Sequence, residues 1–329
     1  MINNKIDVLG IGNAIVDVLA RTDDKFLVRH GLQKGSMVLI DAENATHLYS
    51  EMGPAIEASG GSAANTIAGI ASLGGKTGFI GRVANDQLGE VFSHDIRSLG
   101  VEYSTQLGRD GTPTARSFIL VTPDGERTMN TFLGASQGLS LEDLNEDLIK
   151  RAKITYLEGY LWDPKEAKKA FLKAMEISKG AGNKVALTLS DGFCVVRYRE
   201  EFKELVDNKV DILFANEEEI KSLYEVEDFE EAVSFVKGKA ELIVLTRGEK
   251  GAIILKGLER FDVPAEPTDV VDTTGAGDLY AAGFLYGYCQ GYEMKKCGKI
   301  AAICAAEVIS HFGARPKEGL KRLVSSKVY

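Results

Sequence analysis

Short apolar runs alternate with helical patterns along most of the chain, and this alternation limits the possible folds more than any other feature. Runs typical of buried parallel strands occupy residues 6–11, 77–80, 154–157, 185–189, 212–215 and 242–245. Amphipathic helical patterns lie between several of them, at 165–178, 217–224 and 229–236. Such alternation is typical of βαβ units, whose parallel strands are covered by helices on both faces. We therefore predict a three-layer α/β/α domain with a mostly parallel central sheet.

Two segments, at about 13–40 and 101–133, interrupt the alternation. They contain β-like stretches at 36–40, 116–122 and 127–132, and the turn Pro123-Asp124-Gly125 between the last two predicts a hairpin. We expect a small β-rich lid built from these two insertions into a single domain that spans residues 1–329.

Composition excludes several classes of function. The chain has 329 residues, 44% of them hydrophobic and 26% charged, with a formal net charge of -9 and no basic run. This balance argues against binding nucleic acid or an anionic membrane, and no apolar run reaches transmembrane length. The four cysteines form no CxxC pair, which favours a reducing cytoplasm. We expect a cytoplasmic protein with a small-molecule substrate, either a monomer or a homodimer.

The most informative motif is Asp272-Thr-Thr-Gly-Ala-Gly-Asp278. A strand-like approach meets a turn of small residues, and a helical pattern comes next. Backbone N–H groups of Gly275, Ala276 and Gly277 would be uncovered at a helix N-terminus, which favours an anion. Asp278 adds a carboxylate in the same turn, which suits a base that accepts a hydroxyl proton beside a phosphoryl group. The alternative is an ordinary turn in which Asp278 only complements the helix dipole.

Two polar motifs near the N-terminus are candidates for substrate binding. Gly60 and Gly61 allow close approach to the backbone, and Asn65 offers an amide to hydroxyl groups. Asn13 and Asp17 lie just beyond the first predicted strand, where open α/β sheets bind ligands. The alternatives are a glycine-rich loop that caps a helix, and a lid carboxylate that faces solvent.

Two later motifs are candidates for nucleotide or metal binding. Asn216-Glu-Glu-Glu219 has the pattern of a helix capping box, and Glu219 is alternatively an outer-shell organiser of a metal–phosphate site. Thr246-Arg-Gly248-Glu-Lys-Gly251 comes directly after a predicted buried strand. It is either a loop that lies over a nucleotide or a tight hairpin.

Taken in order, these motifs resemble the PfkB family of carbohydrate and nucleoside kinases, which includes ribokinase and adenosine kinase. Gly60-Gly61-x-x-x-Asn65 is similar to the N-terminal signature of that family, and residues 272–278 are similar to its C-terminal signature. Asn216-x-x-Glu219 and Thr246-Arg-Gly248-x-x-Gly251 fall where the family has two further motifs. The resemblance extends from about residue 6 to residue 316.

The resemblance implies a ribokinase-like fold and ATP-dependent phosphorylation of a primary hydroxyl group. It implies that Asp278 is the catalytic base and that residues 275–278 form the anion hole. The sugar hydroxyls would be held by Asp17, Gly61 and Asn65. The nucleotide and ion sites would comprise Thr246 and Gly248 for ATP, Glu219 with Asn216 for Mg²⁺ through water, and Asp272, Thr274 and Gly313 for K⁺ through backbone oxygens.

Within the family the chain looks most like adenosine kinases. The spacing Asn13-x-x-x-Asp17 resembles their pattern, and Tyr160-Leu-Trp162 stands where they line the base site. Trp162, the only tryptophan, would stack on a purine or would instead pack in the core or at the rim. Arg127, in the predicted hairpin, could reach the transferred phosphoryl group. We expect an adenosine kinase; a kinase for a free sugar such as ribose or fructose, and a non-catalytic ligand-binding protein, are the alternatives.

Overall fold

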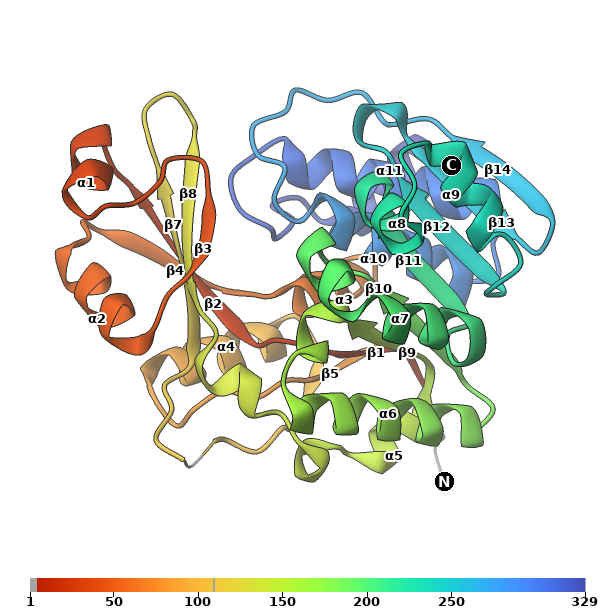
Figure 1. Cartoon of the computed structure of the whole chain (residues 1–329), viewed down its shortest axis with the longest axis horizontal. Helices are drawn as coiled ribbons and strands as arrows, with labels where there is room; N and C mark the ends of the chain where they lie inside the picture. The colour runs from red at the N-terminus through yellow and green to blue at the C-terminus, as the bar shows by residue number, and fades with distance from the viewer. Residues whose placement is uncertain (1–4, 109, 329) are drawn as a thin grey trace.

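Two β-sheets organise the chain (Figure 1). The computed structural model describes residues 5–108 and 110–328. The central sheet has nine strands in the order β14-β13-β12-β11-β10-β9-β1-β5-β6, and all its pairs are parallel except β12–β13 and β13–β14. Its strands are β1 (Ile6–Ile11), β5 (Thr77–Ile80), β6 (Glu102–Tyr103), β9 (Ala152–Glu158), β10 (Lys184–Thr188), β11 (Ile212–Asn216), β12 (Leu242–Thr246), β13 (Ala252–Lys256) and β14 (Glu259–Val263).

Helices cover both faces of the central sheet, because successive side chains of its apolar strands point to opposite faces. In β1, Val8 belongs to one hydrophobic core, whereas Leu9 belongs to the other. The core around Val8 includes residues from α3 (Ser62–Ser72), α4 (Gln87–Ser98), α10 (Ala276–Cys289), α11 (Met294–Ile309) and α12 (Leu320–Val328). The core around Leu9 includes residues from α5 (Glu146–Arg151), α6 (Lys165–Gly180), α7 (Gly192–Asn208), α8 (Glu217–Tyr224) and α9 (Phe229–Val236).

This three-layer arrangement confirms the predicted ribokinase-like α/β/α fold. None of the helices in the described part of the chain has the length and apolar character needed to span a bilayer.

The second sheet stands to one side of the central sheet (Figure 1). Its strand order is β3-β8-β7-β2-β4. Two helices, α1 (Asp24–Arg29) and α2 (Ala42–Glu51), contribute Leu27 and Leu48 to the core against it. Its strands are β2 (Ile15–Arg21), β3 (Met37–Leu39), β4 (Ala55–Gly60), β7 (Ala115–Val121) and β8 (Arg127–Phe132).

The β7–β8 hairpin agrees with the hairpin predicted across Pro123-Asp124-Gly125. The β4 strand was not expected, since it lies outside the ranges 13–40 and 101–133. Its sequence, Ala-Ile-Glu-Ala-Ser-Gly, carries little intrinsic β preference. It forms at the edge of the sheet through antiparallel pairing with β2, and this pairing brings Gly60 next to Ile15.

Glycines let α10 lie close to its neighbours. A Cβ atom on Gly283 would lie 2.6 Å from the Cα atom of Ala301 in α11. On the α3 side, a Cβ atom on Gly69 would lie 2.7 Å from the Cβ atom of Ala282. Close packing on both sides therefore determines where the N-terminus of α10 lies.

We expect Gly283→Ala to destabilise the protein, because the added methyl group meets backbone atoms of α11 that cannot rotate away. Overpacking of this kind costs about 1–3 kcal/mol, and urea unfolding followed by circular dichroism measures it. Gly180→Ala is the matched control. It lies at the exposed end of α6, where a Cβ atom would meet nothing within 4 Å. It should leave stability unchanged or raise it by about 0.5–1 kcal/mol. Equal stability of the two variants would contradict the packing argument.

Candidate active site

A cavity of about 980 Å³ lies between the two sheets. The second sheet contributes side chains that include Asp17, Ser117 and Thr131, which are aligned across β2, β7 and β8 by the strand register. The central sheet contributes residues at the carboxyl ends of its strands, and α3 and α10 contribute their first turns. Ligands of open α/β sheets bind at this edge, so the cavity is the candidate active site.

Asp278 lies in the first turn of α10 and lines the cavity. Ser62 Oγ donates to its Oδ1 at 2.6 Å, and Asn65 Nδ2 donates to its Oδ2 at 2.9 Å. Burial raises the pKa of Asp278, while these two hydrogen bonds and the positive charge of Arg315 oppose the rise. A half-buried carboxylate that is held by two hydrogen bonds and faces the cavity suits a general base.

The turn before α10 has the conformation that the glycine motif predicts. Gly275 is the N-cap residue with φ +79°, and a Cβ atom there would lie 2.9 Å from the Cβ atom of Ala314. A Cβ atom on Gly277 would meet nothing within 4 Å. Gly275, Ala276 and Gly277 all line the cavity. The N-terminus of a 14-residue helix is therefore open to an anion.

The second sheet reaches this turn through Arg127, at the start of β8. Its guanidinium forms an ion pair with Asp272, and its Nη1 donates to Thr274 Oγ1 at 2.8 Å. Buried Asp272 also accepts hydrogen bonds from the backbone N–H groups of Thr274 at 3.0 Å and Gly313 at 2.9 Å. Thr274 lines the cavity, whereas Asp272 and Gly313 lie outside its lining and hold the turn together.

Gly60 and Gly61 bring α3 against the start of the second sheet. Gly61 has φ +97°, and a Cβ atom on it would lie 2.2 Å from the carbonyl oxygen of Asn13. A Cβ atom on Gly60 would lie 2.5 Å from Oδ2 of Asp17. Asp17, Gly61 and Asn65 line the cavity. Burial raises the pKa of Asp17 to about 7, against the lowering effect of Arg315.

Glu158, at the end of β9, is a cavity residue that the sequence analysis missed. It is fully buried, and its Oε1 accepts hydrogen bonds from Asn13 N at 2.7 Å and Asn13 Nδ2 at 2.6 Å. Its Oε2 accepts from Ala63 N at 2.8 Å. Burial raises its pKa to about 7, opposed by these hydrogen bonds. The sequence does carry one sign of this role, because Glu158 is a carboxylate directly after a predicted buried strand.

Trp162 does not line the cavity, contrary to the expected stacking role. It is buried, its Nε1 donates to Glu201 Oε2 at 3.0 Å, and its ring centroid lies 6.0 Å from that of Phe202. The 3₁₀ turn Gly159–Trp162 directs Trp162 into the core, while Tyr160 lines the cavity. The core-packing alternative for Trp162 is therefore correct.

Asn216, at the end of β11, and Glu219, in α8, form a capping box and also line the cavity. Glu219 N donates to Asn216 Oδ1 at 2.8 Å, and Asn216 N donates to Glu219 Oε2 at 3.0 Å. Burial raises the pKa of Glu219 to about 7. Thr246, the last residue of β12, lines the cavity beside them.

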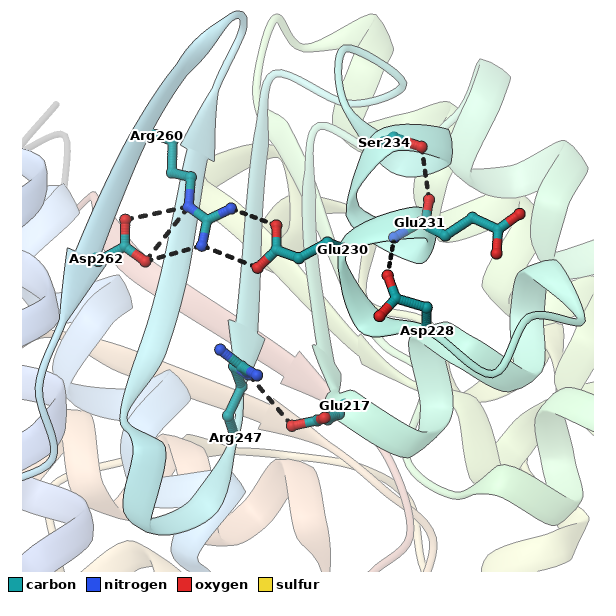
Figure 2. Close-up of polar contacts among 8 residues, drawn as sticks. All are labelled: Glu217, Asp228, Glu230, Glu231, Ser234, Arg247, Arg260 and Asp262. Carbon is teal, nitrogen blue, oxygen red and sulfur yellow. Dashed lines mark hydrogen bonds and ion pairs between the residues drawn. The ribbon is translucent and has the colours of Figure 1, made fainter.

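Gly248 and Gly251 lie in the turn between β12 and β13, outside the cavity lining. Their φ angles of +56° and +83° favour glycine, and the segment is the turn of the β12–β13 hairpin. A role of this turn over a nucleotide stays a prediction. Figure 2 shows the polar contacts on this side of the molecule. Arg247 Nε donates to Glu217 Oε2 at 3.2 Å, which joins the turn to α8, and Arg260 on β14 pairs with Glu230 of α9.

An uncovered helix N-terminus that favours an anion, a half-buried carboxylate beside it and a second sheet across the cavity are the features expected of a phosphoryl-transfer site. A profile of the pfkB family carbohydrate kinases matches residues 51–318. The chain belongs to this family and is a kinase.

Two solved structures are 52% identical in sequence to this chain, each with a TM-score of 0.91. One is a probable sugar kinase from Rhizobium etli, for which the match covers 98% of each chain. The other is adenosine kinase from Sinorhizobium meliloti, for which it covers 98% of this chain and 100% of the other. A 5-dehydro-2-deoxygluconokinase from Geobacillus thermodenitrificans is 30% identical over 263 residues, 76% of this chain and 78% of the relative.

The raised pKa of Glu158 predicts a pH-dependent stability. The group titrates at about 7 in the folded protein and near 4.5 in the unfolded chain, so between these values the folded state retains a proton that the unfolded state has lost. Its stabilising contribution is complete below about pH 4.5 and is lost as the pH rises to about 7. In Glu158→Gln, the fall in unfolding free energy between pH 5 and 7 should be smaller by about 1–3 kcal/mol.

Urea unfolding at several pH values measures this slope. Glu249→Gln, which changes an exposed carboxyl group outside the cavity lining, is the control and should show the wild-type slope. A slope of Glu158→Gln equal to that of wild type would show that Glu158 is ionised throughout this range.

Proposed function

We propose that this kinase transfers the γ-phosphoryl group of ATP to the primary hydroxyl of a nucleoside, and that the nucleoside is adenosine. The observation that carries the choice of acceptor is an apolar rim on both sides of the cavity. Met37 and Leu39 on β3 are 47% and 57% exposed, and Phe193 and Val196 on α7 are 81% and 57% exposed. All four line the cavity.

A free sugar is polar over most of its surface and would not bury such side chains favourably. A nucleobase is flat and largely apolar on its faces, and it would remove part of these four side chains from water. The 52% identity to the adenosine kinase of Sinorhizobium meliloti supports the same choice.

The second candidate is a kinase for a free sugar or sugar acid. The relative named as a 5-dehydro-2-deoxygluconokinase favours it. Buried Glu158 and Asn13 favour it too, because they give the cavity a polar floor that a small, hydroxyl-rich acceptor would match.

In the proposed mechanism, Asp278 accepts the proton of the attacking hydroxyl. Asp17 and Asn65 hold the other hydroxyl groups of the acceptor, and the backbone N–H groups of residues 275–278 receive the charge of the transferred phosphoryl group. Positioning and charge neutralisation supply most of the catalysis in such transfers. Arg127, already beside Thr274, adds a positive charge near this turn.

Family membership implies ATP, and we propose that its binding involves Asn216, Thr246 and Thr274, which line the cavity. The β12–β13 turn, with Gly248 and Gly251, would border the nucleotide without contacting its phosphates.

Mg²⁺ neutralises phosphate charge in such reactions. Both oxygens of Glu219 accept hydrogen bonds from Asn216, so these two residues fit a role through water rather than direct ligation. Within residues 5–108 and 110–328, no group of three or more His, Cys, Asp or Glu side chains could hold a metal ion.

The side chain of Asp272 does not fit K⁺ ligation in this arrangement. Its oxygens are already engaged by Arg127 and by two backbone N–H groups. A K⁺ site formed by backbone oxygens near Asp272 and Gly313 stays a prediction.

The second sheet would act as the lid, closing over the acceptor by rotation near Gly12–Asn13 and Gly60–Gly61. Closure would exclude water, which otherwise competes with the acceptor hydroxyl. A cytoplasmic location and a monomeric or homodimeric state stay predictions.

Asp278→Asn tests the catalytic base. Asparagine keeps the shape of the side chain but cannot take the proton, so we expect a folded protein whose kcat is about 10²–10⁴-fold lower. A coupled ADP-release assay measures kcat, and circular dichroism checks the fold. Asp262→Asn, on an exposed surface strand, is the control and should keep wild-type kcat. Turnover of Asp278→Asn near that of wild type would overturn the mechanism.

A screen of adenosine, other nucleosides, ribose and fructose with ATP tests the acceptor. We expect turnover with adenosine, and in Phe193→Ser a KM for adenosine raised about 10-fold with the KM for ATP unchanged, because part of an aromatic contact is worth about 1–1.5 kcal/mol. The matched control is Phe235→Ser, which changes an exposed phenylalanine stacked on Tyr224 in α8, outside the cavity lining. Turnover with free sugars alone would establish the second candidate.

A further inference from the structure

Arg315, in the segment between α11 and α12, donates hydrogen bonds to the glycine turn at the start of α3, which runs from Ser59 to Ala64. Its Nε donates to the backbone oxygen of Ser59 at 2.8 Å, and its Nη2 donates to Ser59 Oγ at 2.9 Å. Its Nη1 donates to the backbone oxygen of Ala64 at 2.7 Å. One planar guanidinium therefore forms hydrogen bonds with both ends of the turn from Ser59 to Ala64.

This turn has no capping side chain of its own and is held by contacts with other elements, among them β2 and Glu158. Gly61 is the N-cap residue of α3 and has no side chain that could cap the helix. With a φ of +97° at Gly61 and no side chain at Gly60, the local sequence imposes little restraint. Ala63 N donates to Glu158 Oε2 in place of a capping side chain, and Arg315 adds donors to oxygens of Ser59 and Ala64, on either side of Gly61.

Ser59 links Arg315 to a third element. Ser59 N and Ser59 Oγ both donate to Asp95 Oδ2 on α4, at 2.9 and 2.5 Å. The positive charge of Arg315 faces Asp95, Asp17 and Asp278. The network thus joins the end of β4, helix α4 and the C-terminal segment directly behind the acceptor side of the cavity.

The turn from Ser59 to Ala64 contains Ser62 and is followed directly by Asn65, the two residues that hold the proposed base. Ser62 and Asn65, in the first turn of α3, donate to the two oxygens of Asp278. A shift of the turn would move both donors together and rotate the carboxylate. Catalytic groups displaced by about 1 Å lose on the order of 10²-fold in rate.

We propose that Arg315 is a positioning residue for phosphoryl transfer: its guanidinium clamps the turn from Ser59 to Ala64, so that Ser62 and Asn65 hold the Asp278 carboxylate toward the acceptor hydroxyl. The proposal rests on the proposed role of Asp278 as the base. It assigns Arg315 no contact with substrate, and it requires the fork geometry of arginine rather than a positive charge alone.

The test compares Arg315→Met and Arg315→Lys with wild type, using ATP and adenosine, or the acceptor that wild type phosphorylates in the screen above. We expect kcat to fall at least about 30-fold in Arg315→Met. The KM for ATP should stay within about twofold of wild type, because the nucleotide side of the cavity is built from β11, β12 and α8. Lysine keeps the charge but not the fork, so it should restore less than about a tenth of the lost kcat. Rates are measured well below each variant's melting temperature.

Arg97→Met is the matched control. Arg97 on α4 also donates from Nε to a backbone oxygen, that of Tyr103 at 3.0 Å, and its side chain lies away from the cavity lining. It should lower the melting temperature without lowering kcat. If Arg315→Met behaves like Arg97→Met, or if Arg315→Lys restores wild-type kcat, the clamp is wrong.

Ser59→Ala keeps the test decisive if Arg315→Met does not fold. It removes the hydrogen bonds of Ser59 Oγ with Arg315 and with Asp95. It should therefore lower kcat about 3–10-fold and leave the KM for ATP unchanged. Wild-type kcat in Ser59→Ala would contradict the proposal. Asp278→Asn separates the two claims. If this variant loses turnover while the Arg315 and Ser59 variants keep it, the positioning role of Arg315 is wrong, whereas the role of Asp278 as the base is retained.

Discussion

The hydrogen bonds from Ser62 and Asn65 to the carboxylate of Asp278 are the contacts on which the rest of the site depends. The partners are 216 and 213 residues apart in the chain. Donors of this kind favour the ionised form of a half-buried carboxylate. They meet because α3 and α10 pack together through Gly69 and both begin at the same edge of the central sheet.

Around this contact the protein concentrates acidic groups in one cavity that must also accept a polyphosphate. Asp17, Glu158 and Glu219 each have a pKa raised to about 7 by burial, which lowers the negative charge they carry near neutral pH. Two arginines also balance negative charge here: Arg127 pairs with Asp272 beside the turn before α10, and Arg315 faces Asp17, Asp95 and Asp278. These groups, with the N-terminus of α10, make phosphate binding compatible with a chain of net charge -9.

Much of the central sheet could be predicted because its strands and helices carry strong local periodicity. The strand predicted at 242–245 and the helix predicted at 229–236 match β12 and α9 to within one residue. The weakly patterned edge strand β4 was missed, because it depends on its pairing with β2. Trp162 was placed wrongly, since a single aromatic residue in a 3₁₀ turn gives no sign of which way it points. Glu158 was missed because one carboxylate ends an otherwise apolar run.

The sequence by itself determined the strand–helix alternation of the central sheet, the family, and the turn at 272–278, because hydrophobic period and glycine placement are local properties of the chain. Only the tertiary structure decided which side chains share the cavity, that Tyr160 rather than Trp162 faces it, and that Arg315 grips the turn before α3. The physical reason is that these contacts join segments up to 256 residues apart. Sheet order and helix packing bring such segments together, and no local pattern records that.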